Sequence, residues 1–209
     1  MRLYDYAASG NCYKARLLLA LLGTEYERVP IDIFAGDTLT EAYGRLNPVR
    51  ETPVLELDDG AVITQSGAIL WYLAEGTAFL PGDRLGRAHV AQWLAFEQER
   101  VMGGIGGPRF RALTGRAPIP GRLETGAAAL QLLDATLATR DWLVGDGPTI
   151  ADVANYAYAH VAPDAGLDLE PLPAFRAWTE RIAALPGYVN DFVRYPPNAN
   201  QGAGRSIYD

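Results

Sequence analysis

The first residues whose types and spacing suggest chemistry lie in Ser9-Gly10-Asn11-Cys12, between a short predicted strand and a predicted helix. The first N–H groups of a helix have no intrahelical partner, and the helix dipole favours negative charge there. The hydroxyl of Ser9 or the carboxamide of Asn11 could donate a hydrogen bond to a thiolate, which lowers the pKa of a bound thiol from its usual value of about 8.5. Both side chains are also common helix N-caps, so this segment alone is equally consistent with a structural role.

A second candidate segment is Thr52-Pro53, directly ahead of the apolar run Val54-Leu55. Because proline cannot donate a hydrogen bond within a sheet, Pro53 marks the entrance of a strand, where its peptide bond can be cis. With a cis bond, the N–H and C=O groups of Thr52 would be free to pair with the backbone of an extended peptide. An ordinary trans proline at a strand start is the alternative.

A third candidate segment is Gln65-Ser66, which leads into an apolar helical stretch. Ser66 is well placed as an N-cap, and a carboxylate could bind between its hydroxyl and the N–H groups that follow. Taken alone, this motif is explained by helix capping. The three segments indicate more together than each does alone, because they occur in this order and at these spacings in one chain.

The predicted elements place these segments in one small mixed domain. Parallel strands must be joined by a crossover, usually helical, whereas a tight turn such as Asp58-Asp59-Gly60 joins antiparallel strands. The order of elements therefore indicates a mixed sheet with helices packed on it. We expect strands at 2–6, 26–32, 53–57 and 61–63, helices at 11–22 and 66–74, and a short helix opened by a capping box at Thr38-Leu39-Thr40-Glu41.

Strand patterns fade beyond the first third of the chain, and long helical patterns replace them. We expect helices at 85–102, 123–139, 150–162 and 172–185. The segment Phe79-Leu80-Pro81-Gly82-Asp83 has the composition of a linker. The predicted organisation is a domain at 1–77, a linker at 78–83 and an all-helical domain at 84–209.

The composition excludes several classes of function. The chain has 209 residues, a formal net charge of −7 and a pI of about 4.9, which argues against nucleic acid or an anionic membrane as partner. It has no signal-like segment and no apolar run near the ~20 residues of a membrane-spanning helix, so we expect a cytoplasmic protein. Cys12 is the only cysteine and there are two histidines, so we expect neither an intramolecular disulfide nor a metal site.

Three further features are expected to be structural. Lys14 and Arg16, near a helix start, are interpreted as solvated or snorkelling side chains. The glycine-rich segment 102–108 is expected to break or end a long helix, since it does not follow a strand as a phosphate-binding loop would. The segment 196–204 is expected to be loose.

Together, the three candidate segments ahead of an all-helical region resemble the cytosolic glutathione S-transferase family, of bacterial type with a zeta/theta-like or nu-like active-site segment. The resemblance covers most of the chain. It implies an α/β thioredoxin-like N-terminal domain plus an all-α C-terminal domain, with glutathione as cosubstrate and a homodimeric assembly. In the same family, Pro148-Thr149-Ile150-Ala151-Asp152 resembles a structural N-capping box of the helical domain.

The resemblance also implies roles for particular residues in binding glutathione. The backbone before the cis-proline pairs with the cysteinyl part of the tripeptide, and the Gln-Ser pair holds the γ-glutamyl carboxylate. Arg50 or Glu51, which directly precede Thr52 in the sequence, would lie near the tripeptide. The implied glutathione-binding residues are Arg50, Glu51, Thr52, Pro53, Gln65 and Ser66.

The thiol-activating residue is either Ser9 or Asn11. Ser9 corresponds to the activating serine of zeta- and theta-like members, whereas the nu-like pattern shares the sulfur between the Ser9 and Asn11 positions. Cys12 lies one position beyond the cysteine of beta- and omega-like members, so we expect it to pack at the helix start. The acceptor pocket is expected to be lined by Phe96, Val101, Arg109 and Phe110.

The leading functional hypothesis is a transferase that directs the thiolate of glutathione at a hydrophobic electrophile. Glutathione-dependent disulfide reduction is the alternative that would give Asn11 more weight. A zeta-like isomerase and a non-catalytic glutathione-binding protein remain open, since a fold does not fix a function.

Overall fold

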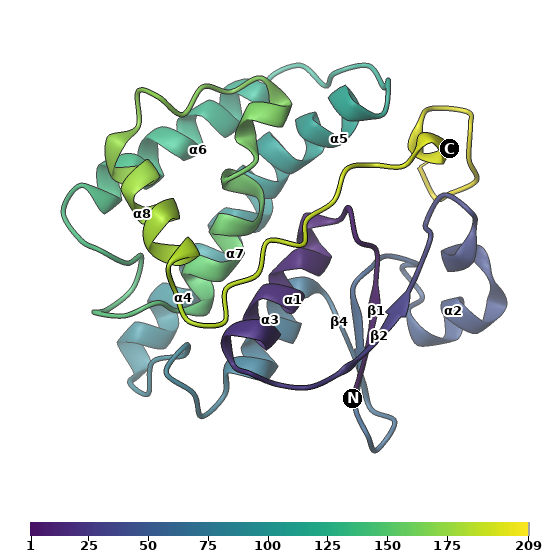
Figure 1. Ribbon diagram of the computed structural model, residues 1–209, viewed down its shortest axis with the longest axis horizontal. Coiled ribbons are helices and arrows are strands. Elements are labelled where there is room, and N and C mark those ends of the chain that lie inside the picture. Colours follow the sequence, from purple (N-terminus) through teal and green to yellow (C-terminus); the bar gives the residue numbers. More distant parts are fainter. Residues whose placement is uncertain (209) are drawn as a thin grey trace.

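The computed structural model describes residues 1–208, with a four-stranded sheet in the first part of the chain and helices in the rest (Figure 1). The strand order is β2-β1-β3-β4, with β1 and β2 parallel and β3 antiparallel to both neighbours. Leu3 lies opposite Leu55, which places two buried side chains on the same face of the sheet. The strands are β1 (Arg2–Asp5), β2 (Glu27–Pro30), β3 (Val54–Glu56) and β4 (Val62–Thr64).

The helices form two sets, one within the sheet domain and one in the later part of the chain. The sheet domain, β1 through α3, contains α1 (Gly10–Leu21), η1 (Asp37–Leu39), α2 (Glu41–Leu46) and α3 (Ser66–Ala74). The helical domain begins with α4 (Arg84–Phe96), the π-helix η2 (Glu97–Gly106), α5 (Gly107–Leu113) and α6 (Arg122–Leu137). It continues with α7 (Ile150–Ala159), η3 (Ala162–Ala165), α8 (Pro173–Ala183) and η4 (Pro197–Ala199). The predicted fold class, an α/β N-terminal domain followed by an all-α domain, is confirmed. The exact ends of the predicted linker between the two domains, 78–83, stay a prediction.

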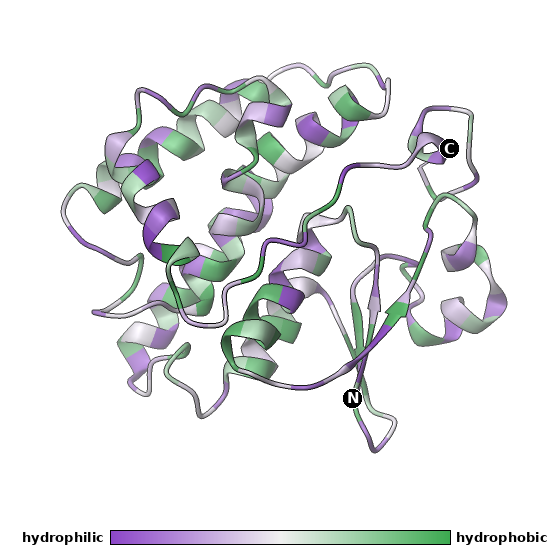
Figure 2. Cartoon of the chain, in the orientation of Figure 1, coloured by the Kyte–Doolittle hydropathy of each residue, from purple (hydrophilic) through white to green (hydrophobic). Residues whose placement is uncertain are grey.

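Helix α1 is held by both domains. Ala15 and Leu19 belong to the small core between the sheet and its helices, together with Leu3. Leu17 and Leu18 belong to the larger core of the helical domain, and apolar residues cover much of α1 (Figure 2). The N-terminus of α1 is therefore fixed relative to both domains. None of the helices of residues 1–208 has the length and apolar character needed to cross a membrane.

The predicted capping box at Thr149 and Asp152 is confirmed as the start of α7. The buried carboxylate of Asp152 accepts hydrogen bonds from Thr149 N at 2.9 Å, Leu143 N at 3.0 Å and Trp178 Nε1 at 3.0 Å. Burial raises the pKa of Asp152, while these donors counteract the shift. The motif thus anchors α7 to α8 and to the loop ahead of α7.

The glycine-rich segment does not break the helix as predicted. The chain continues from α4 through η2 into α5, with hydrogen bonds spanning five residues in the π-helical part. The glycines instead permit close packing: a Cβ at Gly104 would lie 2.4 Å from the backbone of Gly126, and one at Gly106 would lie 2.8 Å from the ring of Tyr158. The short-helix prediction is also wrong by two residues, because Thr40, rather than Thr38, is the N-cap of α2.

Candidate functional site

A cavity of about 290 Å³ lies at the N-terminus of α1, between the sheet domain and the helical domain. A small recess adjoins it and shares several lining residues. Seven of the eight residues predicted for thiol activation and glutathione binding line the cavity or the recess: Ser9, Asn11, Glu51, Thr52, Pro53, Gln65 and Ser66. Three segments that are distant in sequence therefore meet at one place.

Ser9 is the N-cap of α1, and its Oγ accepts a hydrogen bond from Cys12 N at 3.3 Å. Capping uses an acceptor lone pair of the hydroxyl and leaves its proton available to a ligand. The capping role and the thiol-activating role of Ser9 are thus compatible rather than exclusive. Cys12 itself is fully buried, and burial raises its pKa to about 12, so it is a packing residue and not a nucleophile.

The loop that precedes β3 is held by two side chains of the α2 region. The Thr52-Pro53 peptide bond is cis. The carbonyl oxygen of Glu51 accepts hydrogen bonds from Tyr43 Oη at 2.9 Å and Asn47 Nδ2 at 2.8 Å. These bonds fix the backbone next to Thr52, which lines the cavity.

Gln65 has an unusual backbone conformation at the start of α3. Its φ angle is 69°, in the left-handed region, where a non-glycine residue costs of order 1–3 kcal/mol. Gln65 occupies the N-cap position without a capping side-chain bond, and Ser66 is the first helical residue, so the prediction that Ser66 caps the helix is wrong. Gln65 and Ser66 both line the recess, so the start of α3 lies beside it.

Arg50 does not line the cavity or the recess, contrary to the prediction. Its Nη1 donates to the carbonyl oxygens of Thr38 at 2.7 Å and Thr40 at 2.9 Å, and a Cβ at Gly44 would lie 2.6 Å from its Nη2. The guanidinium therefore ties the start of α2 to the loop before β3. These two bonds from Nη1 are contacts within the protein fold.

The interpretation of Lys14 and Arg16 as solvated side chains is wrong, since each is 1% exposed. Arg16 forms ion pairs with Asp5 and with Asp191, the latter at 2.9 Å. Lys14 forms an ion pair with Glu97 of η2, with Nζ and Oε2 2.6 Å apart. Both basic residues of α1 thus join the sheet domain to later parts of the chain.

Only one of the four residues predicted for the acceptor pocket lines the cavity, and that residue is Phe110. Val101 is fully buried in the helical core, and Phe96 packs edge-on against Trp93 at 5.1 Å. Arg109 is buried, with Nε 2.9 Å from Asp164 Oδ2. The residues of η2 and α5 that line the cavity are instead Gln98, Met102, Gly106, Gly107 and Phe110.

Four tyrosines that sequence reasoning missed line the cavity: Tyr6, Tyr158, Tyr195 and Tyr208. The hydroxyl of Tyr6 is buried and has no hydrogen-bond partner among residues 1–208, and burial raises its pKa, so it is a neutral phenol. Tyr158 is buried between helices, and its ring leaves no room for a Cβ at Gly10. No sequence pattern indicated the other two, Tyr195 and Tyr208, because contacts of the C-terminal segment with distant residues bring them to the cavity.

Tyr195 and Tyr208 lie on either side of the segment 196–204, which was expected to be loose. The C-terminal segment, residues 195–208, crosses from the helical domain back to the sheet domain (Figure 1). Gln201 N donates to Thr114 O at 3.0 Å, and Arg205 N donates to Phe34 O at 2.8 Å. The segment is therefore held by backbone bonds on both sides of the cavity and forms one of its walls.

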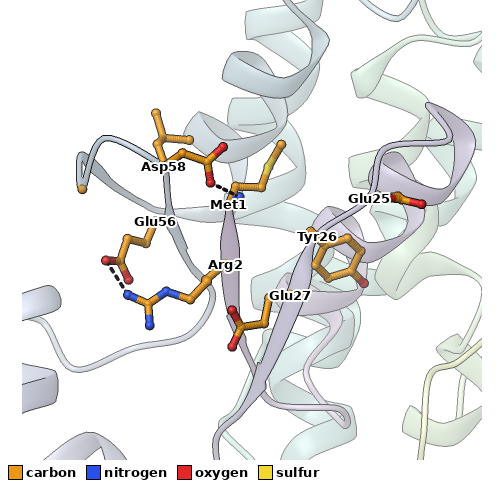
Figure 3. Close-up of a pocket in the computed structure, with 9 residues that line it drawn as sticks. Met1, Arg2, Glu25, Tyr26, Glu27, Glu56 and Asp58 are labelled. Atoms are coloured by element: carbon orange, nitrogen blue, oxygen red, sulfur yellow. Dashed lines mark hydrogen bonds and ion pairs between the residues drawn. The ribbon is translucent and has the colours of Figure 1, made fainter.

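A second, open hollow of about 600 Å³ lies at the other end of β1 (Figure 3). Two ion pairs lie in it: Arg2 Nη2 lies 2.8 Å from Glu56 Oε1, and the amino group of Met1 lies 2.5 Å from Asp58 Oδ1. Because Ser9 follows the opposite end of β1, this hollow is separate from the candidate site. Within residues 1–208, no cluster of three or more His, Cys, Asp or Glu could hold a metal ion.

Comparison with known proteins agrees with this geometry. Family models described as "Glutathione S-transferase, N-terminal domain" and "Glutathione S-transferase, C-terminal domain" match residues 8–75 and 122–186. The chain is 32% identical to a maleylacetoacetate isomerase of Rhizobium meliloti, with 89% of this chain and 92% of the relative covered. It is 29% identical to the disulfide-bond oxidoreductase YfcG of Escherichia coli, with 87% and 89% covered.

A solved structure of a glutathione S-transferase from Pseudomonas fluorescens has a TM-score of 0.86 and 41% identity to this chain. The similarity covers 92% of this chain and 98% of that structure. The matched regions include all three candidate segments of the sheet domain and, in the helical domain, α6 through α8. This chain belongs to the glutathione S-transferase family, whose members use glutathione.

Proposed function

We propose that this protein is a glutathione transferase in which the hydroxyl of Ser9 donates a hydrogen bond to the glutathione thiolate. The observation that carries the proposal is the geometry of Ser9, whose oxygen caps α1 while its proton stays available beside the cavity. A hydrogen bond to the charged form lowers the pKa of the thiol, and the N-terminus of α1 adds a favourable dipole. More of the thiol is then ionised near neutral pH.

Glutathione would lie across the recess in an extended conformation. The backbone of Thr52 would pair with the cysteinyl residue, as an added strand does. The γ-glutamyl carboxylate would bind at the start of α3, where Gln65 and Ser66 line the recess and the first N–H groups have no intrahelical partner. The carboxylate of Glu51, which lines both cavity and recess, would face the ammonium group of the same γ-glutamyl unit.

In the reaction, the thiolate sulfur attacks an electrophilic carbon held in the remaining part of the cavity. A carbon–sulfur bond forms, and the leaving group departs with the electron pair of the bond that breaks. The thiol proton passes to water before the attack. Binding both reactants in one cavity also supplies proximity, because the encounter no longer has to occur in solution.

The acceptor is proposed to be an uncharged, flat apolar molecule. Phe110 and tyrosine rings line this part of the cavity, and no Lys or Arg among residues 1–208 lines it. Maleylacetoacetate, named for the relative in Rhizobium meliloti, carries carboxylates, and the cavity offers no Lys or Arg among residues 1–208 to bind them. The lining therefore favours conjugation over that isomerisation.

Disulfide reduction is a second candidate because Asn11 lines the same cavity as Ser9. In this reaction the thiolate attacks a disulfide sulfur, the other sulfur leaves as a thiolate, and a second glutathione completes the exchange. The Escherichia coli relative that is named a disulfide-bond oxidoreductase makes this reaction worth testing.

Activity toward two acceptors separates these candidates. We expect conjugation of glutathione to a chloronitrobenzene to fall strongly in Ser9→Ala, with turnover of a small mixed disulfide remaining low in every variant. Disulfide turnover that exceeds conjugation and depends on Asn11 would instead identify a reductase. We also propose a two-fold dimer, as the family resemblance implies, and light scattering on the purified chain tests it.

A further inference from the structure

The carboxamide of Asn11 can present two opposite groups to a ligand. One end is an NH2 donor and the other is a carbonyl acceptor, and only the donor end can stabilise a thiolate. A rotation of the carboxamide by half a turn exchanges them. The contribution of Asn11 to the site therefore depends on whatever fixes its orientation.

Lys14 lies on the next turn of α1 and contacts the carbonyl end of this carboxamide. Its Nζ donates to Asn11 Oδ1 at 2.8 Å. Because an ammonium group has donors and no acceptor, it can bind only the oxygen of a carboxamide. The Nδ2 end is then the end left for the cavity that Asn11 lines.

The ammonium group of Lys14 is itself held in place by groups from three other helices. Glu97 of η2 accepts its hydrogen bond at 2.6 Å, and Ser66 of α3 lies at 3.4 Å. The ring centroid of Tyr158, on α7, lies 5.5 Å from Nζ. Lys14 and Glu97 are 1% and 2% exposed, so solvent does not compete for these contacts.

Burial of this ion pair is not explained by stability alone. Burial lowers the pKa of Lys14 and raises that of Glu97, so both groups lose favourable solvation. Apolar pairs of similar size often replace buried ion pairs without loss of stability. An apolar pair, however, could not donate the hydrogen bonds that Asn11 and Ser66 accept from Lys14.

We propose that Lys14 is a positioning residue that holds the Asn11 carboxamide with its NH2 group toward the glutathione sulfur, with Glu97 as the anchor. This inference rests on the proposed function. Through Ser66, which lies 3.4 Å from both Lys14 Nζ and Asn11 Oδ1, the same network connects the thiol end of the site to the start of α3.

The test measures the pKa of the thiol of bound glutathione from its ultraviolet thiolate absorbance. The double variant Lys14→Met/Glu97→Met removes both charges and leaves neither group unpaired. We expect the thiol pKa to rise by about one unit or more, the size of one lost hydrogen bond to a charged group. Adding Asn11→Ala to this variant should cause no further rise in the thiol pKa. Asn11→Ala alone, in the otherwise unchanged protein, should raise the thiol pKa of bound glutathione.

Two controls separate positioning from stability and from charge. Leu133→Ala, in the core of the helical domain, should destabilise the fold and leave the thiol pKa unchanged. Lys14→Gln keeps an N–H donor for Asn11 without the charge and should keep the thiol pKa within about half a unit of the original. If the double variant does not fold, Lys14→Met/Glu97→Gln replaces it, because it also removes both charges and every N–H donor of residue 14 to Asn11, and it should show the same rise in thiol pKa.

An unchanged thiol pKa in the double variant would overturn the inference, as would a full additional effect of Asn11→Ala in that background. A rise in Lys14→Gln as large as in the double variant would overturn it too, because charge rather than orientation would then be responsible. In each case the unsubstituted protein still binds glutathione with a lowered thiol pKa. Failure of that protein to bind glutathione would instead overturn the proposed function and, with it, this inference.

Discussion

Replacement of Ser9 by two different residues separates its two roles. Ser9→Ala removes both the cap of α1 and the donor for a thiolate. Ser9→Asp keeps the cap, because aspartate is among the preferred N-cap residues, but an ionised carboxylate has no proton to donate. The two variants should therefore differ in stability and agree in their loss of thiol activation.

The magnitudes follow from the contacts of Ser9. The 3.3 Å bond from Cys12 N is an N-cap bond, whose loss costs about 1 kcal/mol, or roughly 2–4 °C in Tm for a chain of this size. A hydrogen bond to a charged group contributes about 1.5–3 kcal/mol, which corresponds to roughly 1–2 units of thiol pKa. Repulsion by the carboxylate adds to this rise in Ser9→Asp.

Thermal unfolding and the thiolate absorbance of bound glutathione measure the two effects on one preparation. We expect Ser9→Ala to lose both stability and thiol activation, and Ser9→Asp to keep its Tm while its thiol pKa rises by at least as much. A Ser9→Asp variant with the original thiol pKa would refute the reasoning, because Ser9 would then act only as a cap.

Three further predictions test other parts of the structure. Gly10→Ala places a Cβ 2.4 Å from the ring of Tyr158, so we expect a loss of about 1–3 kcal/mol or more in chemical unfolding, and partial recovery in Gly10→Ala/Tyr158→Leu. Burial lowers the pKa of His160 to about 4, below its unfolded value of about 6.5, so the unfolded state binds more protons between these values and stability falls on acidification. The free energy of unfolding, measured in urea, should therefore fall by about 2 kcal/mol between about pH 7 and pH 5 because of His160. In His160→Phe this contribution to the pH dependence should be absent. Truncation after Tyr195 removes Tyr208 from the cavity, so the KM for the acceptor should rise in steady-state assays while glutathione affinity stays unchanged.

The elements that sequence reasoning placed correctly depend on local patterns. The helix at 66–74 and the hairpin around Asp58-Asp59-Gly60 lie where turn residues and apolar runs put them. The meeting of Ser9, Thr52 and Gln65 was predicted from a family resemblance and not from periodicity. Their shared cavity depends on the strand order, which no short segment encodes.

The failures involve partners that are distant in sequence. Lys14 was interpreted as solvated because its partner, Glu97, lies 83 positions away. The acceptor-pocket prediction named Val101, whereas Met102 lines the cavity and Val101 packs in the core of the helical domain. The C-terminal segment reads as loose from its composition, yet its order comes from backbone bonds such as that to Phe34.

Calorimetric titration with glutathione tests the central claim most directly, because every proposed role assumes that the tripeptide occupies this cavity. We expect saturable binding at one site per chain, weakened at least several-fold in Gln65→Ala and little changed in Arg50→Lys, whose side chain lies outside the cavity. Absence of binding at millimolar glutathione, or equal affinity in Gln65→Ala, would contradict the proposed site.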